Sequence, residues 1–261
     1  MKLKYKLLAV DMDGTLLNSE SAITERTRQA ILAAMEKGVL FVPSTGRPMG
    51  GMQQISASFG FDMPMILFNG AMAVMSKSGR TLFSQGLAPG DAKEIYELGM
   101  ERGIPVVMWM GERLHVSHDC GAIQDYQAIT GATMRPITDF RGVTKMLWLP
   151  PGGNALRWQG EMHAHFGGRV NCHTSRPYIL EFVDAGASKG LALAAVGEAY
   201  GIARGEMIAV GDGYNDVSML EDAGLGVAMG NAPEDIKRLC QHVTLSNDED
   251  GVAAVIEKFI L

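Results

Sequence analysis

Short apolar runs alternate with amphipathic segments over much of the chain, and this alternation predicts an α/β protein with a largely parallel sheet. Uninterrupted apolar runs that end at Gly, Asp, Ser or Asn are typical of strands buried on both faces. Such runs occupy residues 7–10, 39–43, 63–70, 207–210 and 225–229. Other segments carry apolar residues at helical spacing, which predicts helices over residues 24–38, 189–201, 216–224 and 249–260.

The first predicted helix carries clear start and stop signals. Thr24 can cap its N-terminus, and Gly38 can end it. Within it, Ile31, Ala34 and Met35 fall on one face at helical spacing. We therefore expect an amphipathic helix directly after the first strand.

The middle of the chain follows a different pattern. Two helical segments there are separated by paired strand-like runs, and short turns inside each pair indicate antiparallel pairing. The helical segments are 91–103 and 155–168, and the paired runs are 105–110 with 113–118 and 169–175 with 178–183. We expect a separate α+β domain, residues 85–184, inserted into a core domain made of residues 1–84 and 185–261.

Composition and charge narrow the class of protein. A hydrophobic content of 47% with 20% charged residues is ordinary for a globular chain of 261 residues that buries a core. The net charge of −6 argues against a non-specific nucleic-acid binder, which would carry a basic face. No apolar stretch approaches the roughly 18 residues needed to span a bilayer. We expect neither nucleic acid nor membrane as a partner.

Cellular location follows from the cysteines and the N-terminus. The chain has three widely spaced cysteines, an odd number that suggests reduced thiols. The apolar run at residues 7–10 is too short for a signal peptide. We therefore expect a cytoplasmic protein.

Four polar clusters carry the candidate chemistry. Three follow predicted strands and one opens a helix: Asp11-Met12-Asp13-Gly14-Thr15, Ser44-Thr45-Gly46-Arg47, the segment 211–216, and Ser188-Lys189-Gly190. Ligands of open parallel sheets bind outside the carboxyl ends of the strands, so these clusters would converge on one edge. Four carboxylates would gather there: Asp11, Asp13, Asp212 and Asp216.

Four gathered carboxylates repel one another unless their charge is offset. Either some of them take up protons, or a hard divalent cation binds among them. Mg²⁺ prefers a few carboxylates together with substrate phosphate and water. Lys189, Thr45 and the backbone N–H groups of the Gly-containing turns would then hold phosphate oxygens.

Six motifs, in this order, resemble those of the haloacid dehalogenase superfamily and, within it, the Cof-type sugar phosphatases. They are DMDGTLL, STGRP, NGA, SKG, GDGYNDVSML and GVAMGNA. The resemblance covers the segments of the predicted core, and the insert fits the family's cap in position and length. It implies a Rossmann-like core with an inserted α+β cap. It also implies a Mg²⁺-dependent phosphatase for small phosphorylated metabolites, above all sugar phosphates.

The resemblance further implies a role for each matching residue. Asp11 would be the nucleophile that forms an aspartyl-phosphate, and Asp13 would be the general acid and base. Mg²⁺ would be held by the side chains of Asp11 and Asp212 and the backbone carbonyl of Asp13. Asp216 would support the site through bound water or Lys189. The phosphoryl group would be bound by Met12, Thr45, Gly46, Lys189 and Asn215.

Several alternatives stay open at this stage. Arg47 and Asn69 lie within the motifs, and each could contact substrate or only stabilise its loop. A phosphotransferase resembling a hexose-phosphate mutase would pass the same aspartyl-phosphate to a sugar hydroxyl. A non-enzymatic protein would bind a phosphorylated metabolite without turnover. The histidines and cysteine at 163, 165, 172 and 173 lack the spacing of a structural zinc site. The motifs specify neither the individual substrate nor the oligomeric state.

Overall fold

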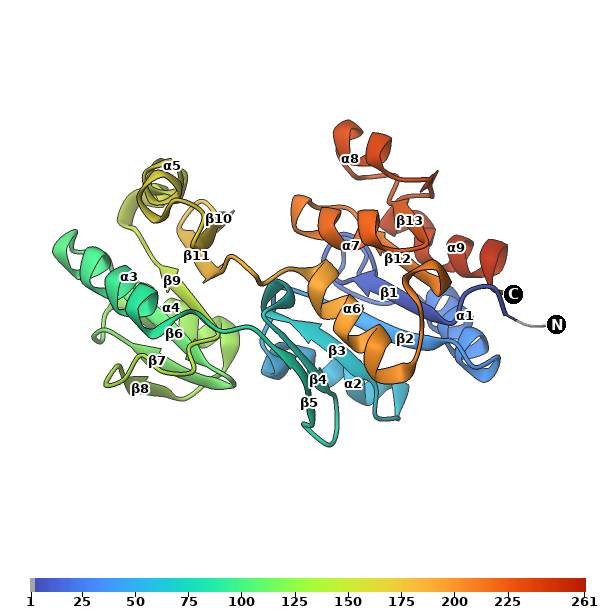
Figure 1. Cartoon of the computed structure of the whole chain (residues 1–261), viewed down its shortest axis with the longest axis horizontal. Helices are drawn as coiled ribbons and strands as arrows, with labels where there is room; N and C mark the ends of the chain where they lie inside the picture. The colour runs from blue at the N-terminus through green and yellow to red at the C-terminus, as the bar shows by residue number, and fades with distance from the viewer. Residues whose placement is uncertain (1–2) are drawn as a thin grey trace. The chain divides into compact units, whose positions relative to one another are not determined.

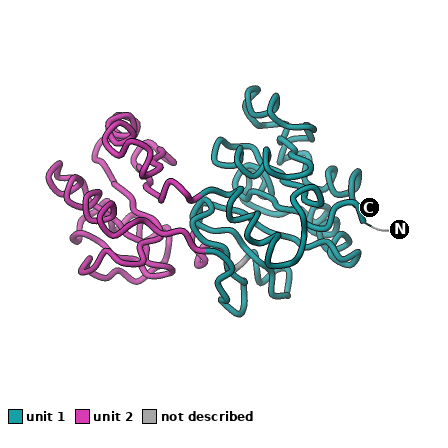
Figure 2. The backbone as a smooth tube through the Cα atoms, in the orientation of Figure 1, with its two compact units in different colours: residues 1–47, 53–83, 188–261 teal, residues 48–52, 84–187 magenta. Residues whose placement is uncertain are grey.

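The structure, a computed structural model, describes residues 3–261, with only the backbone described at positions 53 and 54. The chain divides into two compact units (Figure 2). Unit 1 comprises the chain up to Arg47 together with Gln53–Phe83 and Ser188–Leu261, and unit 2 comprises Pro48–Met52 and Ser84–Ala187. Among the described residues, no helix combines the length and apolarity that crossing a membrane requires.

Unit 1 is built on an eight-stranded sheet, shown in Figure 1, with the order β14-β13-β12-β1-β2-β3-β4-β5 among its described residues. The strands are β1 (Leu7–Asp11), β2 (Leu40–Ser44), β3 (Pro64–Leu67), β4 (Met72–Met75), β5 (Thr81–Ser84), β12 (Met207–Gly211), β13 (Leu225–Ala228) and β14 (His242–Val243). The strands from β14 to β3 pair in parallel, whereas β4 runs antiparallel to β3. The predicted α/β class with a largely parallel sheet is confirmed.

Helices cover both faces of this sheet. They are α1 (Glu25–Glu36), α2 (Gln53–Phe59), α6 (Lys189–Tyr200), α7 (Val217–Asp222), α8 (Glu234–Leu239) and α9 (Gly251–Phe259). Leu193 of α6 and Met219 of α7 share one core cluster with Ala9 of β1. Successive strand residues point to opposite faces, and Leu8 and Val10 are nevertheless as buried as Ala9. Burial on both faces explains why β1 is uninterruptedly apolar up to its final residue.

The first helix forms as predicted. The Thr24 side chain accepts the backbone N–H of Thr27 at 3.1 Å, which caps the N-terminus. Ile31 and Ala34 are buried, as expected for the face that packs on the sheet. The sequence analysis missed β4, β5, α2 and α8. The apolar run at 63–70 was predicted as one strand, but it ends at Leu67, and a turn then reverses the chain into β4.

Unit 2 contains a six-stranded sheet with the order β10-β11-β9-β6-β7-β8. Its strands are β6 (Val106–Met110), β7 (Arg113–Val116), β8 (Met134–Pro136), β9 (Lys145–Trp148), β10 (Val170–Arg176) and β11 (Ile179–Asp184), and its helices are α3 (Pro89–Glu101), α4 (Gly121–Thr130) and α5 (Ala155–Phe166). Both antiparallel pairs expected from the sequence are present, β6 with β7 and β10 with β11. The sequence analysis missed β9, which joins the two pairs, as well as α4 and β8.

Candidate active site

The candidate site lies at the carboxyl edge of the central parallel strands of unit 1. Asp11 is the last residue of β1, and it lies beside Ser44, the last residue of β2. On the other side of β1, β12 ends at Gly211, so Asp212 follows at the same edge. Adjacent parallel strands therefore bring Asp11, Thr45 and Asp212 together, as their positions after strands predicted.

Lys189 is fully buried and bridges two carboxylates. Its Nζ atom donates to Asp11 Oδ1 at 2.5 Å and to Asp216 Oδ1 at 2.6 Å. The residue opens α6, whose N-terminus is capped by the Ser188 side chain accepting the N–H of Leu191. Burial alone would lower the pKa of Lys189, but the two carboxylates raise it above its ordinary value. The ammonium group therefore stays charged inside the protein.

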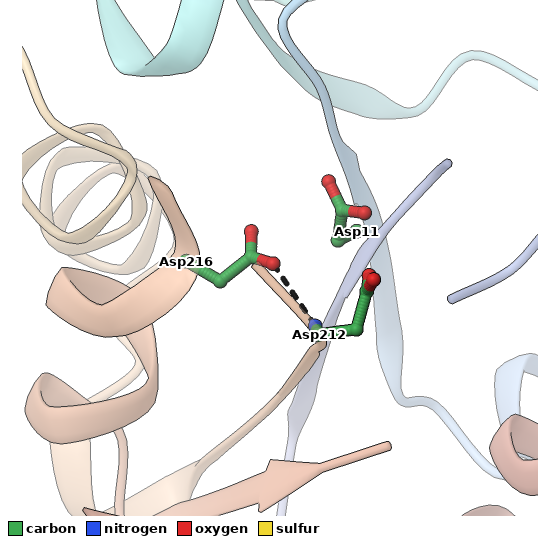
Figure 3. Close-up of side chains that lie close together, drawn as sticks. All are labelled: Asp11, Asp212 and Asp216. Carbon is green, nitrogen blue, oxygen red and sulfur yellow. Dashed lines mark hydrogen bonds between the residues drawn. The ribbon is translucent and has the colours of Figure 1, made fainter. Parts of the chain in front are cut away.

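Asp216 is also fully buried, and all its described partners are donors. Besides accepting from Lys189, it accepts the backbone N–H groups of Asp212 at 3.1 Å and Gly213 at 2.9 Å through Oδ2. Figure 3 shows Asp216 reaching toward the backbone of Asp212, with Asp11 beside them. Asp216 thus fixes the turn that presents Asp212, in addition to holding Lys189.

Asp212 is held from the loop that follows β1. Its Oδ1 atom accepts the hydroxyl of Thr15 at 2.7 Å. Gly14, one residue earlier, has φ of +85°, and a Cβ atom there would lie 2.5 Å from Asp212 Oδ2. Burial, as the largest cause, raises the pKa of Asp212 above its ordinary value. Close approach of the loop therefore requires glycine at this position.

The charge balance of the group fits a divalent cation. One carboxylate oxygen from each of Asp11, Asp212 and Asp216 lies within 4.8 Å of the others, whereas Lys189 supplies one positive charge. The pKa of Asp11 is raised to about 7: burial is the largest cause, Lys189 opposes it, and the neighbouring Asp216 and Asp212 add to it. Hard carboxylate oxygens with surplus negative charge are the donors that Mg²⁺ prefers.

Replacing Gly14 with alanine tests this geometry. The new Cβ would displace the Asp212 carboxylate, and misplaced ligands commonly cost about 10–100-fold in metal affinity. We therefore expect Gly14→Ala to raise, by about that factor, the Mg²⁺ concentration that half-maximally increases the unfolding temperature. Thermal unfolding across a Mg²⁺ titration measures it.

Gly38→Ala is the matched control. Gly38 has φ of +93° with no atom within 4 Å of the added Cβ, so it incurs the same backbone strain without a clash. Both variants should lose about 1–3 kcal/mol of stability, but only Gly14→Ala should weaken the Mg²⁺ response. An equal Mg²⁺ response in both variants would contradict the role given to the close approach.

Asp13 differs from the buried carboxylates because its side chain is 59% exposed. The Arg47 guanidinium binds both of its oxygens, with Nε donating to Oδ2 at 3.0 Å and Nη2 donating to Oδ1. The carboxylate of Asp13 is therefore paired with Arg47, whereas the close group of carboxylate oxygens consists of Asp11, Asp212 and Asp216. The sequence analysis left open whether Arg47 contacts substrate or stabilises its loop. The structure pairs it with Asp13 of another loop, a contact that no fixed spacing predicts.

The other predicted phosphoryl-binding residues lie in the loops that follow β1, β2 and β12. The buried Thr45 hydroxyl accepts the backbone N–H of Arg47 at 3.1 Å, which leaves its own O–H to donate. Asn215 Nδ2 donates to Asn69 Oδ1 at 3.1 Å, and Gly46 packs against the same Asn69 side chain. Met12 has a fully buried side chain, and its carbonyl accepts the N–H of Leu17 at 2.9 Å.

Two asparagines that the sequence analysis missed donate hydrogen bonds to the loop that follows β1. Asn231 Nδ2 donates to the carbonyl of Gly14 at 2.9 Å, and Asn247 Nδ2 donates to the carbonyl of Leu17 at 3.0 Å. The Asn247 backbone N–H in turn donates to Asn231 Oδ1 at 3.1 Å. Asn231 belongs to the GVAMGNA motif, which is the signal that could have identified it.

The histidines of unit 2 have structural partners. His163 Nε2 is 2.6 Å from the Cys172 carbonyl, and His165 Nε2 is 2.8 Å from Glu94 Oε1. Within residues 3–261, the side chains that could jointly hold a metal are the three aspartates of unit 1.

Comparison with known proteins gives a family match over most of the chain. The model of the haloacid dehalogenase-like hydrolases matches residues 8–256. The phosphatase YcsE of Bacillus subtilis, named for 5-amino-6-(5-phospho-D-ribitylamino)uracil, is 31% identical over 260 residues, covering 98% of this chain and 96% of YcsE.

Solved structures agree with this match. A haloacid dehalogenase-like hydrolase from Bacteroides thetaiotaomicron superposes with a TM-score of 0.85 at 32% identity, covering 98% of this chain and 99% of that one. The HAD subclass IIB sugar phosphatase BT4131 has a TM-score of 0.82 at 24% identity, over 97% and 98% of the two chains, and shares the fold. The resemblance first noted in the motifs is confirmed: the chain belongs to the haloacid dehalogenase-like hydrolases and is a phosphatase of that family.

Proposed function

We propose that this phosphatase depends on Mg²⁺ and hydrolyses small phosphorylated metabolites, sugar phosphates foremost, through an aspartyl-phosphate on Asp11. The observation that carries the proposal is the buried group in which Lys189 joins Asp11 to Asp216. A lysine kept charged beside a carboxylate suits a site that must receive a doubly charged phosphoryl group. A purely structural ion pair would have no need for the further carboxylate of Asp212 beside it.

In the first chemical step, Asp11 attacks phosphorus, and the bond between phosphorus and the alcohol oxygen breaks. Asp13 protonates the departing alcohol and later removes a proton from the water that hydrolyses the aspartyl-phosphate. The exposure of Asp13 supports this role, because an alcohol and a water molecule can reach its carboxylate. Lys189, Thr45, Asn215 and the backbone of Met12 and Gly46 bind the phosphoryl oxygens.

The metal would occupy the acidic group of unit 1. Its ligands would be the carboxylates of Asp11 and Asp212 and the backbone carbonyl of Asp13, with Asp216 in support through Lys189. When bound there, Mg²⁺ would offset the charge of the carboxylates and of the phosphoryl group. Lys189 neutralises one charge, so the remaining negative charge supports a divalent rather than a monovalent ion.

The substrate class, the role of the inserted segment and the cellular location are inferred from three further observations. YcsE and BT4131 are named for a phosphoribityl compound and for sugar phosphates, and both are phosphorylated polyols or sugars. The core residues are assigned to the phosphoryl group and the metal, so we propose that residues 85–184 form a cap that selects the leaving group. The three cysteines are free thiols, which supports a cytoplasmic location: Cys120, Cys172 and Cys240.

Phosphate release from a panel of compounds tests the proposal. The panel comprises sugar phosphates, nucleotides and phosphorylated cofactors, each assayed with Mg²⁺ and with a chelator. We expect release with Mg²⁺, with sugar phosphates ranking first, and loss of release with chelator, because the charge on the carboxylates and substrate is then not offset. Transfer of phosphate between sugars without net release would instead identify a phosphotransferase, and binding without turnover a phosphometabolite-binding protein.

A further inference from the structure

The turn after β3 holds two consecutive non-glycine residues in the left-handed region. Phe68 has φ of 53° and Asn69 has φ of 57°. A bulky side chain rarely adopts this conformation, which persists where the surrounding structure imposes it and which concentrates at functional sites. The aromatic ring of Phe68 is fully buried, so packing holds the turn from one side.

Backbone hydrogen bonds tie this turn to the loop that follows β2. The N–H of Asn69 donates to the carbonyl of Thr45 at 3.0 Å, and the N–H of Phe68 donates to the carbonyl of Arg47 at 3.3 Å. Thr45 itself is anchored in the sheet, because its N–H donates to the carbonyl of Ile66 at 2.8 Å. Three backbone hydrogen bonds therefore connect the strained turn, the predicted phosphoryl-binding loop and the sheet.

The Asn69 side chain reaches from this turn to two predicted phosphoryl-binding residues. Its Oδ1 atom accepts a hydrogen bond from Asn215 Nδ2 at 3.1 Å. It also lies against Gly46, where an added Cβ would approach Oδ1 to 2.9 Å and Nδ2 to 3.2 Å. The loops after β2 and β12 thus meet at one amide, which the strained backbone holds in place.

We propose that Asn69 is a positioning residue that fixes Asn215 and the Gly46 backbone in the geometry that receives the phosphoryl oxygens. A carboxamide nitrogen carries two hydrogens. When Asn69 accepts one of them, the plane of the Asn215 amide is set, and its second N–H is directed to donate elsewhere. Asn69 acts through these two residues rather than on the reacting atoms. The inference rests on the proposed function, since it assumes that Asn215 and Gly46 bind phosphate.

Asn69→Gly separates the side chain from the backbone, because glycine adopts the left-handed conformation without strain. The variant should fold and should bind phosphate more weakly. Losing one hydrogen bond that orients a phosphate ligand should raise KM for a sugar phosphate, and Ki for inorganic phosphate, by about tenfold. kcat should change less, because the oriented donor contributes to ground-state and transition-state binding alike.

Two controls separate the loss of the Asn69 side chain from the relief of backbone strain. Ser21→Gly relaxes another left-handed residue, φ 58°, in an exposed loop and should change neither KM nor Ki. In an Asn215→Ala background, adding Asn69→Gly should raise KM by a clearly smaller factor than in the wild-type chain, because only the contact with Gly46 is then left to lose. Fully multiplying effects, or a change in stability alone, would overturn the inference.

Binding of inorganic phosphate with Mg²⁺, measured by calorimetry, keeps this inference distinguishable from the proposed function. Weaker binding by Asn69→Gly than by the wild-type chain supports the positioning role even without turnover. Equal binding by the two chains would overturn the inference alone. A wild-type chain that binds no phosphate would overturn the proposed function and the inference together.

Discussion

Asp11→Asn is expected to reduce phosphate release by at least about 10⁴-fold in kcat, since removing an enzymatic nucleophile can cost on the order of 10⁶-fold. The amide cannot attack phosphorus, so no aspartyl-phosphate can form. The amide oxygen can still accept the hydrogen bond from Lys189 that Asp11 Oδ1 accepts at 2.5 Å. The variant should therefore lose phosphate release but should still fold.

The stability of Asp11→Asn should equal or exceed that of the wild-type chain in the absence of metal. The pKa of Asp11 is raised to about 7, mainly by burial. The charged form of this carboxylate therefore lowers the stability of the folded state. Phosphate release under saturating Mg²⁺ and urea unfolding in chelator measure the two properties. Trapping of the wild-type acyl-phosphate with hydroxylamine would identify the covalent intermediate directly.

Asp222→Asn is a suitable control, because it removes a partly exposed carboxylate that pairs with Arg204 on the surface. It should leave phosphate release unchanged, as surface pairs contribute little. Residual activity above about 1% in Asp11→Asn, against the expected factor, would mean that a different group attacks phosphorus. Activity equal to wild type would remove the covalent mechanism altogether.

The sequence predicts the position of the site well, because the rule involved is local. Asp11, Thr45 and Asp212 each follow a buried strand, and adjacent parallel strands end at the same edge. Knowing the strands was therefore sufficient to bring these residues together. Lys189 is different: a lysine that opens a helix is ordinarily solvated. Its complete burial became understandable only with both carboxylate partners in place.

Contacts between loops could not be predicted from spacing. The pairing of Arg47 with Asp13, and of Asn69 with Asn215, joins residues 34 and 146 positions apart. Each depends on loop conformations that tertiary packing imposes, including the left-handed Asn69. The same holds for β9, the Lys145–Trp148 strand, whose short apolar run lacks an alternating pattern and gains its role by pairing with β6 and β11.

Lys189→Met is expected to destabilise the metal-free protein by roughly 3–5 kcal/mol, the usual cost of leaving buried charges unpaired. The wild-type Nζ atom touches Asp11 and Asp216 at 2.5 and 2.6 Å, and neither carboxylate gains another cation in the variant. Phosphate release should fall as well, by about 10³-fold, since a charged donor to the phosphoryl group is lost. Lys93→Met, at a 60% exposed position, is the control and should change stability by less than about 0.5 kcal/mol.

The loss in Lys189→Met should grow with pH. The folded-state pKa of Asp11, about 7, lies above its ordinary value of 3.8, so the folded chain holds a proton that the unfolded chain releases. Stability contributed by this group therefore falls as pH rises from about 4 to 7. Without Lys189 the pKa of Asp11 rises further. Urea unfolding in chelator should show a smaller loss at pH 5.5 than at pH 8.

A second substitution separates the structural and chemical roles of Lys189. Adding Asp216→Asn to Lys189→Met removes one of the unpaired charges, while the new amide oxygen can still accept the N–H groups of Asp212 and Gly213. Stability should recover by about 1–3 kcal/mol, the usual size of coupling between contacting residues. Phosphate release should stay low, because no cation has been returned to the phosphoryl site. Recovery of both stability and phosphate release would mean that Lys189 only neutralises the carboxylates. Recovery of neither would mean that the unpaired Asp216 is not what destabilises Lys189→Met.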